Sequence, residues 1–89
     1  MAEAKLDVHV VTPEQEVWAG EADMVVATAS DGQLGVLPGH APLLALLGTG
    51  PLAVVFGGQR TEIDVDGGFL HVNSDRVDVL AERAELPEA

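Results

Sequence analysis

Cysteine is absent from the 89-residue chain, and aromatic side chains are limited to Trp18, Phe56 and Phe69. Without cysteine the chain can form neither a disulfide framework nor a thiolate metal site. With so few aromatic rings, any core must be filled by Val, Leu and Ala. Because 47% of the residues are hydrophobic, the chain has enough apolar material for one globular domain.

Basic residues are also scarce. Lys5 and three arginines stand against fifteen acidic residues, which gives a net charge of −11. A surface of this sign repels phosphate backbones and anionic headgroups, so we expect neither nucleic-acid binding nor direct lipid insertion. The charge favours solubility and a basic or neutral protein partner, and it equally fits an acidic surface that is merely solvated.

Long hydrophobic runs are missing as well. The longest apolar segments, such as residues 41–47, are far shorter than the roughly 20 residues that a membrane-spanning helix needs. The N-terminus has no basic stretch followed by an apolar core, so no signal peptide is predicted.

Glycine and proline are concentrated in residues 31–42, DGQLGVLPGHAP. Glycine reaches backbone angles that other residues adopt only at a cost, and proline fixes its own φ. The stretch therefore predicts a specific backbone shape, which serves either to hold a tight corner of the fold or to offer a rigid surface to a partner.

Residues 5–11 alternate between apolar and polar side chains, which predicts a half-buried strand. Further strands are predicted through Val17 and Trp18 and over residues 24–29, 34–37, 41–47, 52–56, 60–65, 68–72 and 76–84. Residues 41–47 have a composition that also suits a helix, but their shortness and their Pro and Gly borders favour a buried strand. Residues 34–37 are likewise expected to be buried.

Turn residues separate these segments at intervals of about eight to twelve residues, which is typical of an all-β sandwich or barrel. Turns are predicted at residues 48–51, 57–58, 66–67 and 73–75, with Pro51 at the start of its strand because a ladder cannot use a residue without N–H. We expect a flattened sandwich or barrel over residues 1–84, followed by a short frayed tail at residues 85–89.

Side chains that could perform chemistry are few. His9, His40 and His71 have no ligand or acid at helical spacing, so no metal site or catalytic base is predicted. His9 and His71 are expected on polar strand faces. His40 is presented by a Pro-Gly corner, which suits surface recognition.

The sequence Asp64-Val65-Asp66-Gly67-Gly68 invites comparison with aspartic proteases, but the hydroxyl residue that follows the catalytic aspartate in those enzymes is replaced by Gly67. A turn is the better interpretation. No phosphate-binding glycine loop is present. A lipoyl-type carrier needs a lysine at a hairpin tip, and Lys5 lies near the N-terminus. No cofactor is expected.

The chain resembles the N-terminal β-sandwich domain of the epsilon subunit of bacterial F-type ATP synthases. The similarity is strongest over residues 31–44, DGQLGVLPGHAPLL, which contain the specific string LGxLPGHAPL. It continues at residues 6–8, 12–15, 18–22, 48–52, 66–72 and 77–82.

This resemblance implies about ten short antiparallel strands in two sheets. It implies no catalysis. The family's domain is a central-stalk rotor subunit that links the gamma subunit to the membrane c-ring and supports the coupling of proton translocation to ATP synthesis. That would place the chain peripherally on the cytoplasmic face of the bacterial cell membrane.

The resemblance also assigns two contact sets. The c-ring would be contacted by Ser30, Asp31, Gly32 and Gln33. The gamma subunit would be contacted by Val17, Trp18, His40, Ala41, Pro42 and Leu44.

Two departures from the family stand out. Many members carry Glu where Gln33 stands, which puts a charged contact to the ring in question. The usual member continues into a C-terminal helical hairpin that regulates hydrolysis and in some members binds ATP. We therefore expect this 89-residue chain neither to brake the motor with helices nor to bind ATP through them. The alternative function is a stand-alone acidic β-sandwich adaptor, or a small enzyme of another type.

Overall fold

The computed structural model describes residues 5–86, and every regular element among them is a β-strand. The eight strands are β1 Leu6–Val11, β2 Glu16–Ala22, β3 Met24–Ala29, β4 Gly32–Val36, β5 Leu43–Leu46, β6 Thr49–Phe56, β7 Gln59–Asn73 and β8 Arg76–Glu85. The predicted all-β class is confirmed. Within residues 5–86, no helix is long and apolar enough to cross a membrane.

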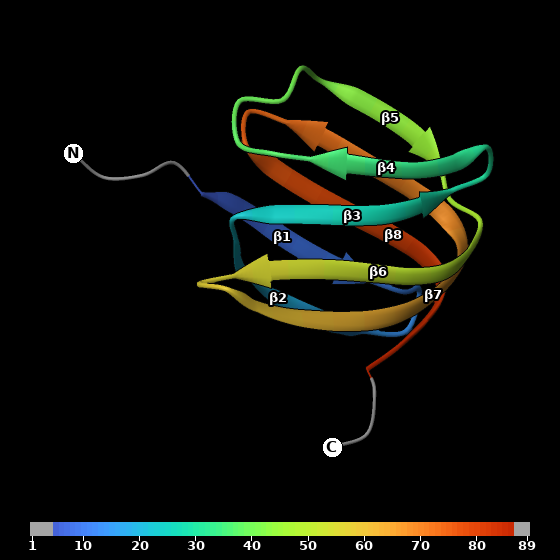
Figure 1. The fold of residues 1–89 in the computed structure, drawn as a ribbon. Helices are drawn as coiled ribbons and strands as arrows, with labels where there is room; N and C mark the ends of the chain where they lie inside the picture. Colours follow the sequence, from blue (N-terminus) through green and yellow to red (C-terminus); the bar gives the residue numbers. More distant parts are fainter. Residues whose placement is uncertain (1–4, 87–89) are drawn as a thin grey trace.

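The strands form two layers that pack face to face (Figure 1). The hydrogen-bonded order is β2-β1-β8-β7-β6-β3-β4, with β5 pairing to β7 outside this path. In Figure 1, β4, β3 and β6 lie in front, while β1 and β8 cross behind them. We call these the front layer and the back layer, and the back layer also contains β5 and β2.

Strand β7 passes from one layer to the other. It pairs with β6 as far as Asp66 and with β5 from Phe69 onward, while β8 accompanies both halves. The bend lies at Gly67 and Gly68, whose φ values are 71° and 112°. A Cβ on Gly68 would lie 2.1 Å from the carbonyl oxygen of Leu80, so only glycine allows the strands to approach so closely here.

The predicted turn at residues 66–67 is therefore wrong, because the chain bends there and continues. This merges two predicted strands into one and leaves eight strands where about ten were expected. The pairing is also not wholly antiparallel, since β1 and β8 run parallel. The parallel pair arises because β1 inserts beside a strand that is distant in sequence, with no hairpin to reverse its direction.

Three local predictions need correction. Pro51 lies inside β6 and not at its start. The missing N–H is tolerated because β3 pairs with β6 only at residues 53–55, so Pro51 has a partner strand on one side. Strand β5 is half-exposed and not buried, since it pairs only with β7. Residues 34–37 are not uniformly buried either, because Leu37 is 57% exposed beyond the end of β4.

The core consists of the inward-facing side chains of both layers. The alternation predicted for β1 is confirmed, since Leu6, Val8 and Val10 are fully buried, as are Val77 and Val79 on β8. The other members of the core cluster are Ala22, Val25, Ala27, Val36, Leu47, Leu52, Val54, Ile63, Val65, Leu70, Val72 and Ala81. Strand β8 ends at Glu85, so its last residue falls in the predicted tail, and residues 87–89 lie outside the described part.

Candidate functional site

The four residues predicted to contact the c-ring lie together at one tip of the sandwich. Ser30 and Asp31 form the turn between β3 and β4, Gly32 and Gln33 begin β4, and all four are exposed. The amide of Ser30 donates a 2.9 Å hydrogen bond to the carbonyl of Leu46, which ties the tip to the end of β5. A depression of about 400 Å³ joins this tip to Leu44 and Leu46.

Residues 37–42, which we call the shoulder, connect β4 to β5 and contain three of the predicted gamma contacts. The amide of His40 donates a 3.1 Å bond to the carbonyl of Leu37. Pro38 and Gly39, with φ of 85° at Gly39, give this corner the form of a type II turn. His40 Nδ1 lies 2.7 Å from the carbonyl oxygen of Ala41, and because a carbonyl oxygen can only accept, Nδ1 is the donor of this hydrogen bond.

The remaining shoulder residues, Ala41 and Pro42, are exposed. They lead directly into β5, where Leu44 is 64% exposed on the outer face of the back layer. The shoulder and Leu44 are therefore contiguous along the chain, and four of the six predicted gamma contacts lie in one region.

Leu44 lies next to a line of apolar side chains that sequence reasoning missed. The strand registers place Leu46 opposite Phe69, Phe69 opposite Leu80, and Leu80 opposite Val11. We call these four residues the apolar row. Leu46, Phe69 and Leu80 are 53%, 47% and 48% exposed, and a shallow depression of about 370 Å³ runs beside Phe69, Leu80, Val11 and Pro13.

The alternation of β8 placed Leu80 on its outward face, but no sequence signal aligned it with its neighbours. Phe69 and Leu46 are brought beside it by pairing between strands that are distant in sequence. An exposed apolar patch on the outer face of a sheet is typical of a protein-binding surface.

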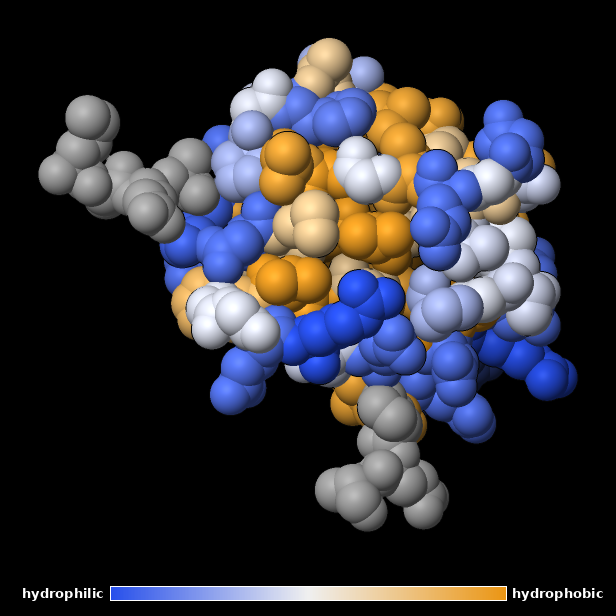
Figure 2. Space-filling view, viewed as in Figure 1, coloured by the Kyte–Doolittle hydropathy of each residue, from blue (hydrophilic) through white to orange (hydrophobic). Residues whose placement is uncertain are grey.

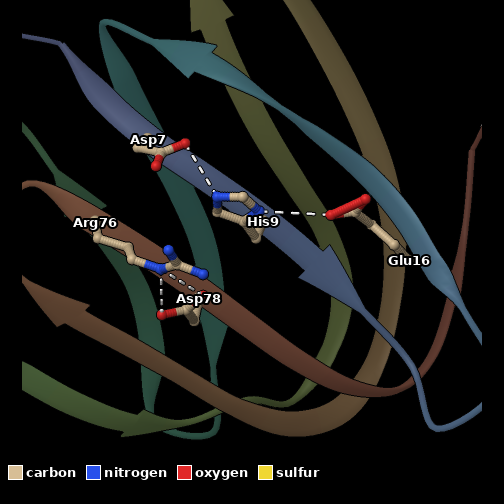
Figure 3. A network of polar contacts seen from close by, with 5 residues as sticks. All are labelled: Asp7, His9, Glu16, Arg76 and Asp78. Atoms are coloured by element: carbon tan, nitrogen blue, oxygen red, sulfur yellow. Dashed lines mark hydrogen bonds and ion pairs between the residues drawn. The ribbon is translucent and has the colours of Figure 1, made fainter.

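A polar cluster occupies the other end of the same outer face (Figure 3). His9 Nε2 lies 3.0 Å from an oxygen of Asp7, close enough for an ion pair but outside hydrogen-bonding geometry, and its Nδ1 lies 3.5 Å from Glu16. Arg76 Nε lies 3.1 Å from both carboxylate oxygens of Asp78. His9 and His71 both lie on the outward side of their strands, since both alternate with buried residues. His9 has polar neighbours as predicted, whereas His71 is paired with the exposed Leu44.

Val17 and Trp18 lie at the opposite edge of the back layer from Leu44. Strand β2 is separated from β5 by β1, β8 and β7, which at about 4.8 Å per strand spacing is roughly 19 Å. Trp18 faces inward with Val10 and packs against the core cluster. Its indole covers Gly20 so closely that a Cβ there would approach it to 2.9 Å.

Trp18 also borders a depression with Val54, Phe56 and Thr61, where β2 meets the β6–β7 hairpin. It therefore closes an open edge of the sandwich, and the structure does not bring it together with His40 or Leu44. Val17 lies at an irregularity in the pairing of β1 with β2, where the register shifts after Val10.

The outer face of the front layer carries a second apolar area (Figure 2). Apolar side chains gather over the middle of this view, with hydrophilic residues along its lower edge. The registers pair Met24 with Val55 and Val26 with Ala53 across this face. Met24, Val26 and Val55 are half-buried, so this area is less open than the apolar row.

Charged side chains near the N-terminus connect three segments. Asp23 pairs with Lys5 and accepts a 2.8 Å hydrogen bond from the amide of Gly57. The Lys5 ammonium also lies 5.5 Å from the centre of the Phe56 ring. The Lys5 hydrogen bond, and secondly the Gly57 amide, hold the pKa of Asp23 below its ordinary value of 3.8.

A further depression, of about 520 Å³, is lined by several acidic residues that include Asp64, Asp66 and Glu82. Asp66 accepts a 2.6 Å hydrogen bond from Thr49. Among residues 5–86, no group of three or more His, Cys, Asp or Glu side chains is arranged to hold a metal ion.

Comparison with known proteins identifies the family of the chain. Residues 5–87 match the family model described as "ATP synthase, Delta/Epsilon chain, beta-sandwich domain". The chain is 56% identical over 80 residues to the ATP synthase epsilon chain of Frankia casuarinae, covering 89% of this chain and 94% of that relative. It is 51% identical over 88 residues to the epsilon chain of Thermobifida fusca, covering 94% of this chain but 64% of that longer relative.

A solved structure of the Euglena gracilis mitochondrial ATP synthase, containing OSCP, F1 and the c-ring, includes a similar chain. The TM-score is 0.87 at 25% identity, and the match covers 94% of this chain and 54% of the Euglena chain. Together with its sandwich fold and the match over residues 5–87, this shows that the chain belongs to the ATP synthase delta/epsilon family, as its β-sandwich domain.

Proposed function

We propose that this chain is a non-catalytic central-stalk subunit of an F-type ATP synthase, where it links the gamma subunit to the c-ring. Its relatives are named ATP synthase epsilon chains, and the similar Euglena chain comes from a structure that contains F1 and the c-ring. The observation that carries the proposal is the apolar row, which the fold leaves exposed on one outer face.

Gamma docks on the apolar row and the neighbouring shoulder. Full burial of a Leu or Phe side chain contributes up to about 1.5–3 kcal/mol, so Leu46, Phe69 and Leu80 are suitable anchors even though each is already half-covered. Leu44, then Pro42, Ala41 and His40, extend this surface along β5 away from the tip, since the tip is tied to Leu46 at the other end of that strand. Val17 and Trp18 remain predicted gamma contacts, but they have less support than the shoulder and Leu44, because they lie at the other edge of the back layer.

The c-ring is contacted by the tip at Ser30, Asp31, Gly32 and Gln33. These residues are polar and exposed, which suits contact with a polar loop. Gln33 offers both a carbonyl acceptor and an amide donor, so it forms neutral hydrogen bonds to the ring in place of an ion pair. The depression shared by the tip and Leu44 makes the two contact regions adjacent.

Such a position transmits torque through the sandwich. Strands β7 and β8 run side by side through both layers and share nine paired positions, so the apolar row belongs to the most extensively paired part of the fold. As a rotor subunit the chain lies peripherally at the cytoplasmic face of the bacterial membrane. Its net charge of −11 opposes insertion among anionic headgroups.

The proposal is tested by mixing the chain with the gamma subunit of the same organism and following both by size-exclusion chromatography. Co-elution is expected, with the c-ring recruited in a second step. Separate elution of chain and gamma overturns the rotor proposal and favours the adaptor alternative, for which affinity capture would find a different protein.

A further inference from the structure

The hairpin between β7 and β8 has an unusual backbone. Its two turn residues, Ser74 and Asp75, have φ values of 52° and 64°, and they lie between the paired residues Asn73 and Arg76. Two-residue hairpin turns of this kind strongly prefer Asn-Gly or Asp-Gly, because left-handed angles are costly for other residues. A glycine would fit more easily at residue 75, so the aspartate there calls for a reason.

The Asp75 carboxylate provides that reason, because it reaches the shoulder. Its Oδ1 accepts a 2.7 Å hydrogen bond from the amide of Gly39. In a type II turn this amide points away from the turn and is free to bond elsewhere. The carbonyl of Asp75 also accepts a 2.8 Å bond from Asp7, so the same residue joins the start of β1 to the hairpin.

The shoulder depends on such anchors because it has no strand partner. Between the end of β4 at Val36 and the start of β5 at Leu43, the chain has only turn and coil structure. Its hydrogen bonds at His40 run to Leu37 and Ala41, within the shoulder itself. The Gly39–Asp75 bond joins the shoulder to a separate hairpin that is part of the rigid β7–β8 ladder.

We propose that Asp75 is a positioning residue for the gamma-binding shoulder. The carboxylate holds Gly39, and with it His40, in a fixed place relative to the outer face of the back layer. A shoulder fixed in advance loses less conformational freedom on binding, which strengthens association without any direct contact from Asp75. This inference rests on the proposed function, since it takes gamma as the partner.

Three variants separate the effect of the Asp75 carboxylate from the effect of the left-handed backbone angles in the turn. Asp75→Gly removes the carboxylate and relieves the left-handed angle. Ser74→Gly relieves the neighbouring angle and keeps the carboxylate, so it is the matched control. Asp75→Asn keeps an oxygen acceptor on a residue type that tolerates left-handed angles, so it should restore wild-type behaviour.

The first readout needs no partner. Amide hydrogen exchange by NMR should show Gly39 exchanging at least ten-fold faster in Asp75→Gly than in Ser74→Gly, while core amides such as Val79 keep their protection. Asp75→Asn should stay within about three-fold of the wild type. Equal Gly39 exchange in Asp75→Gly and Ser74→Gly would overturn the anchor.

The second readout is affinity for gamma by calorimetry. Asp75→Gly should bind several-fold to ten-fold more weakly, with Ser74→Gly and Asp75→Asn close to the wild type. Faster exchange with unchanged affinity would overturn the positioning role while leaving the anchor in place. If the wild-type chain does not bind gamma, the proposed function fails, and the positioning role fails with it, whatever the exchange rates show.

Discussion

Two ends of one sheet face differ sharply although they share the same strands. On β8, Leu80 belongs to the apolar row and Asp78 to the polar cluster, and on β1 the corresponding pair is Val11 and His9. In the polar cluster, Arg76 forms an ion pair with Asp78, and the His9 ring lies 3.0 Å from the carboxylate of Asp7. Leu46, Phe69 and Leu80 of the apolar row remain about half-exposed. One end of the face therefore carries charged and polar groups that lie against one another, and the other carries apolar side chains that suit a partner.

The fold itself requires neither set of outward residues. The inward side chains of both layers already form a continuous core, so neither end of the outer face is needed to build the sandwich. Substitutions in the apolar row should therefore affect binding more than folding, and substitutions in the polar cluster should affect neither strongly.

The largest effect should come from disrupting the close approach of β7 and β8 beside the apolar row. Gly68→Ala places a Cβ 2.1 Å from the carbonyl oxygen of Leu80, which forces β7 away from β8 beside Phe69. We expect a loss of about 3 kcal/mol or more in the free energy of unfolding, measured by urea denaturation. Gly58→Ala is the matched control, since Gly58 also has positive φ but nothing lies near its Cβ. Equal losses in the two variants would contradict the close approach.

The next effect concerns binding. Phe69→Ser combined with Leu80→Ser removes two anchors of the apolar row, and we expect gamma affinity to fall about 100-fold or more, as for hot-spot truncations. The unfolding free energy should change by less than about 1 kcal/mol, because both side chains are half-exposed on an outer face. Calorimetric titration with gamma measures the first quantity and urea denaturation the second.

Asp78→Ala supplies the comparison from the polar cluster, and its affinity for gamma should stay within about three-fold of the wild type. The comparison between the two ends fails if Asp78→Ala weakens binding as strongly as the double variant.

A smaller effect is expected from the ion pair of the polar cluster. Arg76→Ala removes the pair with Asp78, in which the arginine side chain is 55% exposed. Exposed pairs contribute about 0.2–1 kcal/mol, so the unfolding free energy should fall by no more than that, and less at high salt. A loss above about 2 kcal/mol would show that this cluster supports the fold.

The smallest effect is pH-dependent and lies outside both ends of the face. Because its pKa is lower in the folded chain than in the unfolded chain, Asp23 stabilises the fold above its ordinary value of 3.8 and loses this contribution as the pH falls through the folded value. Thermal melts between about pH 5 and pH 2 should show the advantage of the wild type over Asp23→Asn shrinking with acidification. An advantage that grows in acid would contradict the Lys5–Asp23 contact.

Local sequence patterns predicted the inward faces well, because burial on one side of a strand imposes a period of two. The alternations of β1 and β8 follow that period, and their inward residues are buried. The same patterns failed at Asp66-Gly67-Gly68, where the residues suit a tight turn and a bend equally. The chain forms a bend there and not a turn, because β8 pairs with β7 on both sides of the bend and keeps it in the ladder.

The candidate surface was predicted only in part. The Pro-Gly corner and the resemblance indicated His40, Ala41, Pro42 and Leu44, and the structure places these residues in one region. Leu46, Phe69 and Leu80 could not be grouped, because their alignment depends on the registers of three strands and no single stretch of sequence encodes it. Trp18 was grouped with the gamma contacts, but the structure places it apart from them. An isolated aromatic residue in the sequence does not indicate whether its side chain faces a partner or closes an edge of the sandwich.

The absence of cysteine allows the most direct measurement. Leu80→Cys and Asp78→Cys each place one thiol on the same strand, at the two ends of the compared face. Maleimide labelling of each variant, followed by mass spectrometry, would be compared with and without saturating gamma. We predict at least ten-fold slower labelling of Leu80→Cys in the complex and little change for Asp78→Cys. Equal labelling of Leu80→Cys with and without bound gamma would contradict docking on the apolar row.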